Sequence, residues 1–185
     1  FGGWVAFTLR TALHGAPFGF GGLGSDAGRL AAMANRYAST WHSSDGIVPS
    51  VPSNYPPLFP WLVGRTSALV HVPAWRLLGP AETITLSFAV IAGYLLWRYL
   101  APGPLALAVT LPVLLCFSLP VKAFEILALV VFVPWAVATF GDPPRGRLHW
   151  LPAGLIGGLS IVLNWAFIIY GALGILALAV LTWRA

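Results

Sequence analysis

Three long hydrophobic runs, separated by short polar breaks, occupy the middle of the chain. A helix that crosses a bilayer needs about 20 mostly apolar residues, and these runs approach or reach that length. We therefore predict crossings over Ala81–Leu100, Pro104–Leu119 and Phe124–Phe140. The first run is flanked by Pro80 and Pro102, which favour its ends. The pattern predicts an all-α fold, a polytopic transmembrane helical domain.

A fourth hydrophobic run is too long to be one helix. Leu148–Trp183 contains 36 residues without Lys, Arg, Asp or Glu. As one helix it would be about 54 Å long, whereas the hydrocarbon core is about 30 Å thick. The run must therefore break, and Asn164-Trp165 near its middle is the predicted point. We expect two short helices that turn back within or near the outer leaflet.

The first part of the chain is more polar. Residues 1–14 are predicted to be the end of a first crossing, residues 15–57 an external loop that contains a helix, and residues 58–79 a helix lying in the membrane interface. With the transmembrane helices of 81–185, they would make residues 1–185 a single domain. Because the sequence starts at Phe1 rather than Met, we expect it to be a fragment of a longer membrane protein.

The composition excludes an ordinary soluble domain. Hydrophobic residues make up 58% of the chain and charged residues 8%, whereas a soluble domain carries about 25% charge. So few charges cannot solvate a globule of 185 residues, which would expose large apolar patches. The same composition excludes disorder. The lipid bilayer is therefore the expected solvent for most of the chain.

The basic residues are better explained by membrane topology than by nucleic acid. The net charge is +5, but nine Arg and one Lys are scattered singly, so we predict no nucleic-acid partner. Basic residues concentrate on the cytoplasmic side of membrane proteins. This assigns to that side Arg98, Arg145, Arg147 and Arg184. Residues 141–149 would then be cytoplasmic, and residues 15–57 and 120–122 external. The protein is predicted to be multi-pass in the plasma membrane, with its site facing the periplasmic or external side.

The few charged residues of the external loop are the first site candidates. Asp26 follows the segment GFGGLGS, and Ser25-Asp26 has the pattern of a helix N-cap. Asp26 could act in catalysis or only cap that helix. Arg29 and Arg36 lie seven residues apart and hence on one helix face. They could form a solvated stripe or bind phosphate, which guanidinium groups recognise well.

One further single residue and two pairs of residues complete the list of site candidates. Asp45, in the turn Ser-Ser-Asp-Gly, is either an exposed turn residue or a catalytic acid. Asn54 and Tyr55 precede two prolines that stiffen the entry to the next helix. Lys122 and Glu125 lie three apart at the head of a predicted crossing, where they can pair. Charges at a bilayer are costly, so they are functional candidates by default.

Neither a metal site nor a cysteine nucleophile is predicted. His42 has no partners at metal-ligand spacing. The single cysteine, Cys116, lies in an apolar run, which favours a core thiol and excludes an intrachain disulfide.

Taken in order, these features resemble one enzyme superfamily. The segments GSDAGRLAAMANRYAS and NYPPLFPWLVGR, the later run LPAGLIGGLSIVLNWAFIIYGALGIL, and the charged external turn are similar to the GT-C glycosyltransferases. These membrane enzymes use polyprenyl-phosphate sugar donors. Among them the chain most resembles the membrane domain of the actinobacterial arabinofuranosyltransferases that act on cell-wall galactan.

The resemblance implies a reaction and roles. The donor would be decaprenyl-phosphoryl-arabinose and the acceptor a galactan hydroxyl, with no cofactor. Asp26 corresponds to the loop acid that serves as general base, with Asp45 as a rival. Substrate binding would fall to Arg29, Arg36, Asn54, Tyr55, Lys122 and Glu125. Many relatives carry a second acid after the first, but Ala27 follows Asp26 here, which weakens any case for a metal ion.

Other functions are compatible with some of the same residues. Another GT-C transferase, for mannose or aminoarabinose, would share Asp26 and the lipid donor. A lipid transporter segment would need broken helices in repeated halves, and the sequence shows one broken run. A purely structural membrane subunit would not need an acid and arginines in an external loop.

Overall fold

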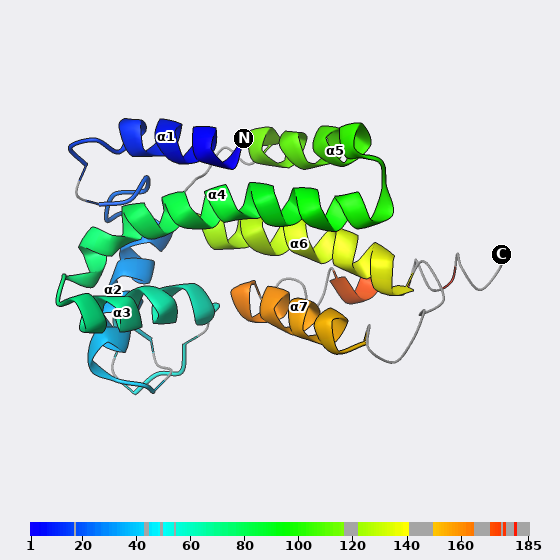
Figure 1. Cartoon of the computed structure of the whole chain (residues 1–185). Helices are drawn as coiled ribbons and strands as arrows, with labels where there is room; N and C mark the ends of the chain where they lie inside the picture. The colour runs from blue at the N-terminus through cyan, green and yellow to red at the C-terminus, as the bar shows by residue number, and fades with distance from the viewer. Residues whose placement is uncertain are drawn as a thin grey trace. The chain divides into compact units, whose positions relative to one another are not determined.

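The structure, a computed structural model, describes residues 1–16, 18–42, 45–48, 50–53, 55–116, 122–140, 150–164, 171–174, 176 and 180 (Figure 1). Within these residues every regular element is a helix, which confirms the predicted all-α class. The named helices, in chain order, are α1 Gly2–Ala12, α2 Ser25–Ser39, α3 Leu58–Val70, α4 Ala74–Leu100, α5 Gly103–Cys116, α6 Ala123–Phe140 and α7 Trp150–Leu163.

The chain forms two compact units, and the single domain expected from the sequence stays a prediction. The first unit comprises Phe1–Phe88 together with Ser118–Phe124. The second comprises Ala89–Phe117 together with Glu125–Ala185. The predicted external loop and the short segment around Lys122, although far apart in sequence, therefore belong to the same unit.

In the first unit α2 packs against α3, and the two helices overlap in the view of Figure 1. The buried side chains of α2 recur at helical spacing, which makes it an amphipathic helix with one apolar face. They are Ala27, Leu30, Ala31, Met33, Ala34 and Tyr37. On α3, the buried residues Phe59, Val63 and Gly64 complete the contact. Gly64 lies against the backbone of Ala34 and Ala38, so the two helices approach closely where it has no side chain.

The predicted interfacial helix over 58–79 is wrong as one element. α3 ends at Val70, and His71 adopts a left-handed conformation at φ 55° and ψ 35°. Pro73 disfavours helical geometry at the residue before it, and the Ser67 hydroxyl donates to the Val72 carbonyl at 2.7 Å. The segment after this break starts α4. The periodicity of the sequence hid this break because apolar residues continue through it.

α4 is longer than the predicted crossing. It begins at Ala74, seven residues before the expected start, and Pro80 lies inside it. Proline removes one backbone hydrogen bond from a helix interior, but the buried neighbours Ala74 and Leu78, 1% and 2% exposed, hold this first part in place. One side of α4 is exposed and apolar along its length: Ile84, Phe88, Ile91, Leu95 and Tyr99.

Among the described residues one helix, α4, is long and apolar enough to cross a membrane. The apolar parts of α5 and α6, Gly103–Pro112 and Ala123–Val137, are shorter. By length and composition the structure therefore supports one crossing. The predicted polytopic arrangement stays a prediction.

Helices of the second unit match the sequence expectations closely. α6 begins one residue before the predicted Phe124 and ends at Phe140 as predicted, and α5 begins one residue before Pro104. α7 ends at Leu163, and Asn164 is not helical, which confirms the predicted break. Small residues allow close packing here: Gly93 lies against Val130, and Gly157 against Trp135.

Parts of the predicted topology lie outside the described residues. They are the end of the second crossing at 117–119, the first residues of the external turn at 120–121, the cytoplasmic loop at 141–149, and residues 165–170 beyond the break.

Candidate functional site

An ion pair joins two of the predicted site residues. Asp26 Oδ2 lies 3.5 Å from Lys122 Nζ, and the two side chains are 42% and 33% exposed respectively. Asp26 belongs to the first turn of α2, where the positive end of the helix dipole stabilises a carboxylate. An exposed pair of this kind is worth about 0–1 kcal/mol. It therefore contributes little to folding and can rearrange at low cost.

The predicted capping role of Ser25 and Asp26 is wrong. The N-cap position is Gly24, which has no side chain to cap with, and the helix begins at Ser25. Ser25 adopts a left-handed conformation at φ 50°. Because the chain enters α2 one residue earlier than the pattern suggested, Asp26 lies inside the first turn. Its carboxylate faces Lys122.

The glycine-rich segment before α2 is held by a carboxylate that the sequence analysis did not select. Glu82, on α4, is 2% exposed, and its Oε2 accepts a hydrogen bond from the Phe20 backbone N–H at 3.0 Å. A Cβ at Gly19 would lie 2.6 Å from Glu82 Oε1, so a larger residue there would displace this carboxylate. An acid inside an apolar run is costly in a membrane protein and a functional candidate by default, and this signal could have identified Glu82.

Arg29, Arg36 and Asp45 form a second group of charges. The Val48 and Ile47 backbone N–H groups, at 3.0 and 2.8 Å from Asp45 Oδ1, hold the pKa of Asp45 below its ordinary value, and the positive charges of Arg29 and Arg36 lower it further. The two arginines therefore act on the same carboxylate, as their shared helix face predicted.

Asp45 closes its own loop. Its backbone N–H donates to the Val51 carbonyl at 2.8 Å, while its side chain caps the turn that follows. The side chain is 8% exposed, so the predicted turn is confirmed but its exposure is wrong. Because the pKa is lowered on folding, the carboxylate stabilises the loop at neutral pH, and this contribution is lost as the pH falls through the lowered pKa. Its rival role as a general base stays a prediction.

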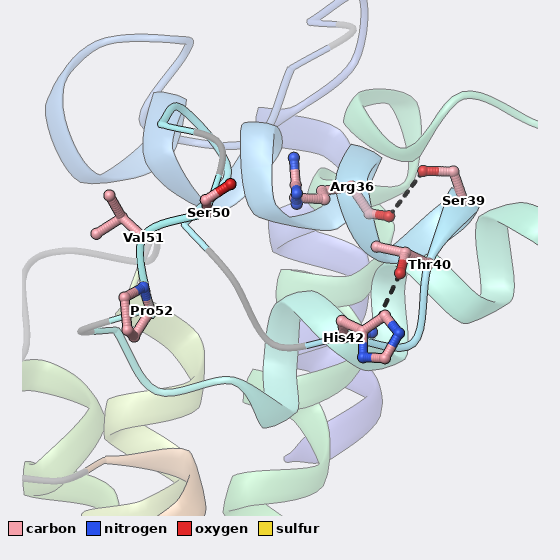
Figure 2. Close-up of a pocket in the computed structure, with 7 residues that line it drawn as sticks. All are labelled: Arg36, Ser39, Thr40, His42, Ser50, Val51 and Pro52. Carbon is pink, nitrogen blue, oxygen red and sulfur yellow. Dashed lines mark hydrogen bonds between the residues drawn. The ribbon is translucent and has the colours of Figure 1, made fainter.

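A cavity of about 490 Å³ lies at the carboxyl-terminal end of α2. Figure 2 shows its lining, with the end of the helix on one side and the loop after Asp45 on the other. The lining residues are Arg36, Ser39, Thr40, His42, Ser50, Val51 and Pro52. Most of them are exposed, so the cavity opens to the outside. Cavities of this volume suit small-molecule or saccharide ligands.

Tyr55 joins the entry segment to the residues next to Lys122. Its ring lies 6.3 Å from that of Phe124, edge to face, and Phe59 stacks on Phe124 at 5.4 Å. The Ser53 hydroxyl accepts the Tyr55 backbone N–H at 3.2 Å. These contacts hold the start of α3 close to Lys122, so Tyr55 is near the ion pair in the fold.

Two predicted candidates stay predictions. Asn54 lies outside the described residues. Glu125, in the first turn of α6, belongs to the second unit, and its predicted pairing with Lys122 stays a prediction. Within the described part of the chain, no group of three or more His, Cys, Asp or Glu side chains could hold a metal ion.

The chain is similar to curated proteins of one kind. It is 30% identical, over 138 residues, to the galactan 5-O-arabinofuranosyltransferase of Mycobacterium tuberculosis (strain CDC 1551 / Oshkosh). The same identity holds for the enzyme of that name from strain ATCC 25618 / H37Rv. The match covers 71% of this chain and 21% of each relative, so the chain spans about a fifth of the length of the relatives it matches. This confirms the resemblance to arabinofuranosyltransferases.

Neither protein-family models nor solved structures show a match to this chain.

Proposed function

We propose that this chain is part of a membrane-bound arabinofuranosyltransferase that moves arabinofuranose from decaprenyl-phosphoryl-arabinose to a hydroxyl of cell-wall galactan, priming arabinan synthesis. The similarity to galactan 5-O-arabinofuranosyltransferases supports the substrate class. The structural observation that carries the proposal is the Asp26–Lys122 ion pair, 3.5 Å between carboxylate and ammonium. Transfer from a lipid phosphate to a hydroxyl needs a base and a cation at one place.

In the proposed reaction, Asp26 is the general base. Its carboxylate takes the proton of the acceptor hydroxyl as that oxygen forms a bond to the anomeric carbon. The bond from this carbon to the phosphate oxygen breaks, and decaprenyl phosphate leaves with one more negative charge. Direct displacement inverts the configuration at the anomeric carbon. General-base assistance is worth about 10²–10⁴ in rate.

Lys122 would respond to that proton transfer. While Asp26 is ionised, the ammonium pairs with it across 3.5 Å. Once Asp26 is protonated, the attraction is lost at the moment when negative charge appears on the leaving phosphate. A cation placed where charge develops lowers the barrier. Because the exposed pair stabilises the fold by little, Lys122 can move from the acid to the phosphate.

Arg29 would bind the donor phosphate next to this pair. It lies on α2 one turn after Asp26, three residues along, and positions three apart are neighbours on a helix. Guanidinium groups bind phosphate oxygens in a bidentate manner. The lipid tail would remain in the bilayer. We place the site on the external side of a multi-pass plasma-membrane protein.

The decisive experiment compares two acids in the intact protein in membranes, assayed with labelled decaprenyl-phosphoryl-arabinose and a galactan acceptor. Asp26→Asn keeps the size of the side chain but cannot take a proton, so we expect kcat to fall by about 10²–10⁴ while donor binding persists. Asp45→Asn is the matched control because the amide oxygen can still accept the Ile47 and Val48 N–H groups.

The pair of variants also separates the two candidate bases. If Asp45→Asn abolished transfer and Asp26→Asn left it near normal, the base would be Asp45. If the wild-type protein transferred no arabinose from this donor but accepted mannose or aminoarabinose from the same lipid, the proposed sugar would be wrong.

A further inference from the structure

We infer that the cavity at the carboxyl-terminal end of α2 binds a neutral carbohydrate chain, namely the acceptor polysaccharide at units remote from the transfer point. This inference rests on the proposed function, which supplies the acceptor. The cavity has a volume of about 490 Å³ and combines hydroxyls and an imidazole with an apolar wall formed by Val51 and Pro52. A sugar ring offers the same combination, hydroxyls at its edge and C–H groups on its faces.

The polar groups of the lining offer both donors and acceptors. The Ser39 hydroxyl donates to the Arg36 carbonyl at 3.0 Å, which leaves its oxygen able to accept. The Thr40 hydroxyl accepts the His42 backbone N–H at 3.2 Å, which leaves its proton available to donate. Figure 2 shows both bonds at the helix end. Sugar hydroxyls are donors and acceptors at once, so such a mixed lining recognises them better than a purely cationic one.

The electrostatics of the cavity disfavour a phosphate. Ser39 is the last residue of α2, and the end of a helix carries partial negative charge from its free carbonyls. Asp45 adds a carboxylate close enough for Arg29 and Arg36 to lower its pKa. The positive charge of Arg36 is therefore compensated locally. A neutral ligand needs no further compensation, whereas an anion would lie next to the negative end of the helix.

The loop wall is held in an unusual conformation. Ser50 adopts a left-handed backbone conformation at φ 68°, which costs energy for a residue other than glycine. The neighbouring Val51 carbonyl is held by the Asp45 N–H at 2.8 Å. Strained residues cluster at ligand sites because the surrounding contacts fix them for function. In this conformation the Ser50 hydroxyl lies on the side of the cavity opposite the end of α2.

The separation along α2 indicates which part of the acceptor the cavity holds. Arg36 follows Asp26 by ten residues, which at 1.5 Å per residue is about 15 Å along the helix axis. This distance exceeds one sugar ring. The acceptor hydroxyl at Asp26 and the units in the cavity must therefore belong to different residues of one saccharide chain. The cavity would select acceptors by their length.

The test measures binding of galactofuranose oligosaccharides to the intact protein in nanodiscs, without donor. Ser50→Gly removes the hydroxyl and suits the left-handed backbone, and it is combined with His42→Ala, an exposed side chain. The expected result is that the ratio of hexasaccharide to disaccharide affinity falls about tenfold, as for two lost hydrogen bonds. Thr66→Ala, an exposed hydroxyl on α3, is the matched control and should keep the ratio.

Two results would overturn the inference. One is an unchanged ratio of hexasaccharide to disaccharide affinity in the double variant, whether both affinities fall equally or neither falls. The other is displacement of the hexasaccharide by millimolar inorganic phosphate, which would make the cavity an anion site. Because binding is measured without donor, failure of the proposed transfer would be visible separately. A protein that binds the hexasaccharide through this cavity but transfers no arabinose would contradict the proposed function and support this inference.

Discussion

The side chain of Glu82 sets the position of the loop that precedes α2. Its carboxylate accepts the Phe20 N–H at 3.0 Å, and Gly19 lies against it with no room for a methyl group. The loop then turns, with the Gly22 N–H bonded to the Gly19 carbonyl at 3.1 Å, and enters α2 next to Asp26. A buried acceptor that loses its partner costs about 1–3 kcal/mol. Glu82 is not part of the ion pair, but it therefore helps to position the start of the helix that carries Asp26, the proposed base.

Gly19→Ala should show this dependence. The added methyl displaces the Glu82 carboxylate and removes its bond to Phe20, so we expect unfolding in detergent to require about 1–3 kcal/mol less free energy. Gly158→Ala in α7 is the control because a methyl there meets nothing within 4 Å. Thermal unfolding of the two variants, measured side by side, checks the prediction. Equal stability of the two would remove Glu82 from this role.

The scarcity of charge made the candidate residues easy to select from the sequence, but it did not predict their surroundings. With five acids in the chain, Asp26 and Asp45 were evident candidates, and the Asp26–Lys122 pair joins two residues selected separately. Glu82 was not among the candidates because it lies inside the predicted crossing Ala81–Leu100. The burial of Asp45 could not be predicted either, because it depends on the loop packing against α2, where Gly46 lies on the backbone of Met33.

At the scale of elements, α2 carries Asp26 in its first turn and part of the cavity lining at its end, and α3 packs against it. Gly64 allows the backbones of α2 and α3 to approach, and Arg65 of α3 contacts the end of α2. The Arg65 guanidinium donates to the Ala38 carbonyl at 2.7 Å and stacks over the Trp41 ring at 4.6 Å. A cation at the end of a helix is favourable because the last carbonyls carry partial negative charge. The contact fixes the end of α2 on which the cavity is built.

Gly64→Ala should separate the two helices. A methyl there would collide with the Ala34 carbonyl and lie 2.6 Å from Tyr37 Cβ, and overpacking of this kind costs about 1–3 kcal/mol. Gly3→Ala in α1 is the matched control because its methyl would meet nothing, and replacing a helical glycine at an open position stabilises by about 0.5–1 kcal/mol. Opposite shifts of the melting temperature are expected. A stabilised Gly64→Ala variant would contradict the close approach.

The element boundaries show where a local pattern suffices. α6 was predicted to within one residue because Lys122 precedes it and the charged segment 141–149 follows it, and the break at Asn164 followed from length alone. The division between α3 and α4 was not predicted. It arises from the left-handed His71 and from Pro73, whereas the hydropathy does not change there. Pro80 was taken as a helix boundary, yet the packing of Ala74 and Leu78 extends α4 past it.

For the whole molecule, membrane insertion is the feature that joins the fold to the proposed donor. The exposed apolar side of α4 recurs every three or four residues, from Ile84 at 69% exposed to Tyr99 at 67%. A soluble protein would cover such a stripe, because large apolar patches associate in water. In a bilayer it needs no cover, since lipid tails contact it. If the arginines predicted to be cytoplasmic lie on that side, we expect the ion pair and the cavity on the external side.

This orientation predicts which cysteines an impermeant maleimide reaches in intact cells. The turn after Asp45 is a suitable place for an external cysteine. Gly46 is not the position to change, because a side chain there would collide with the backbone of Ala32 and Met33. Ile47, 61% exposed, is the better position. In a Cys116→Ala background, Ile47→Cys should be labelled from outside, and Gly146→Cys, in the predicted cytoplasmic loop, only after permeabilisation. The reverse pattern would place Asp26 and Lys122 on the cytoplasmic side, where an external galactan acceptor cannot reach them.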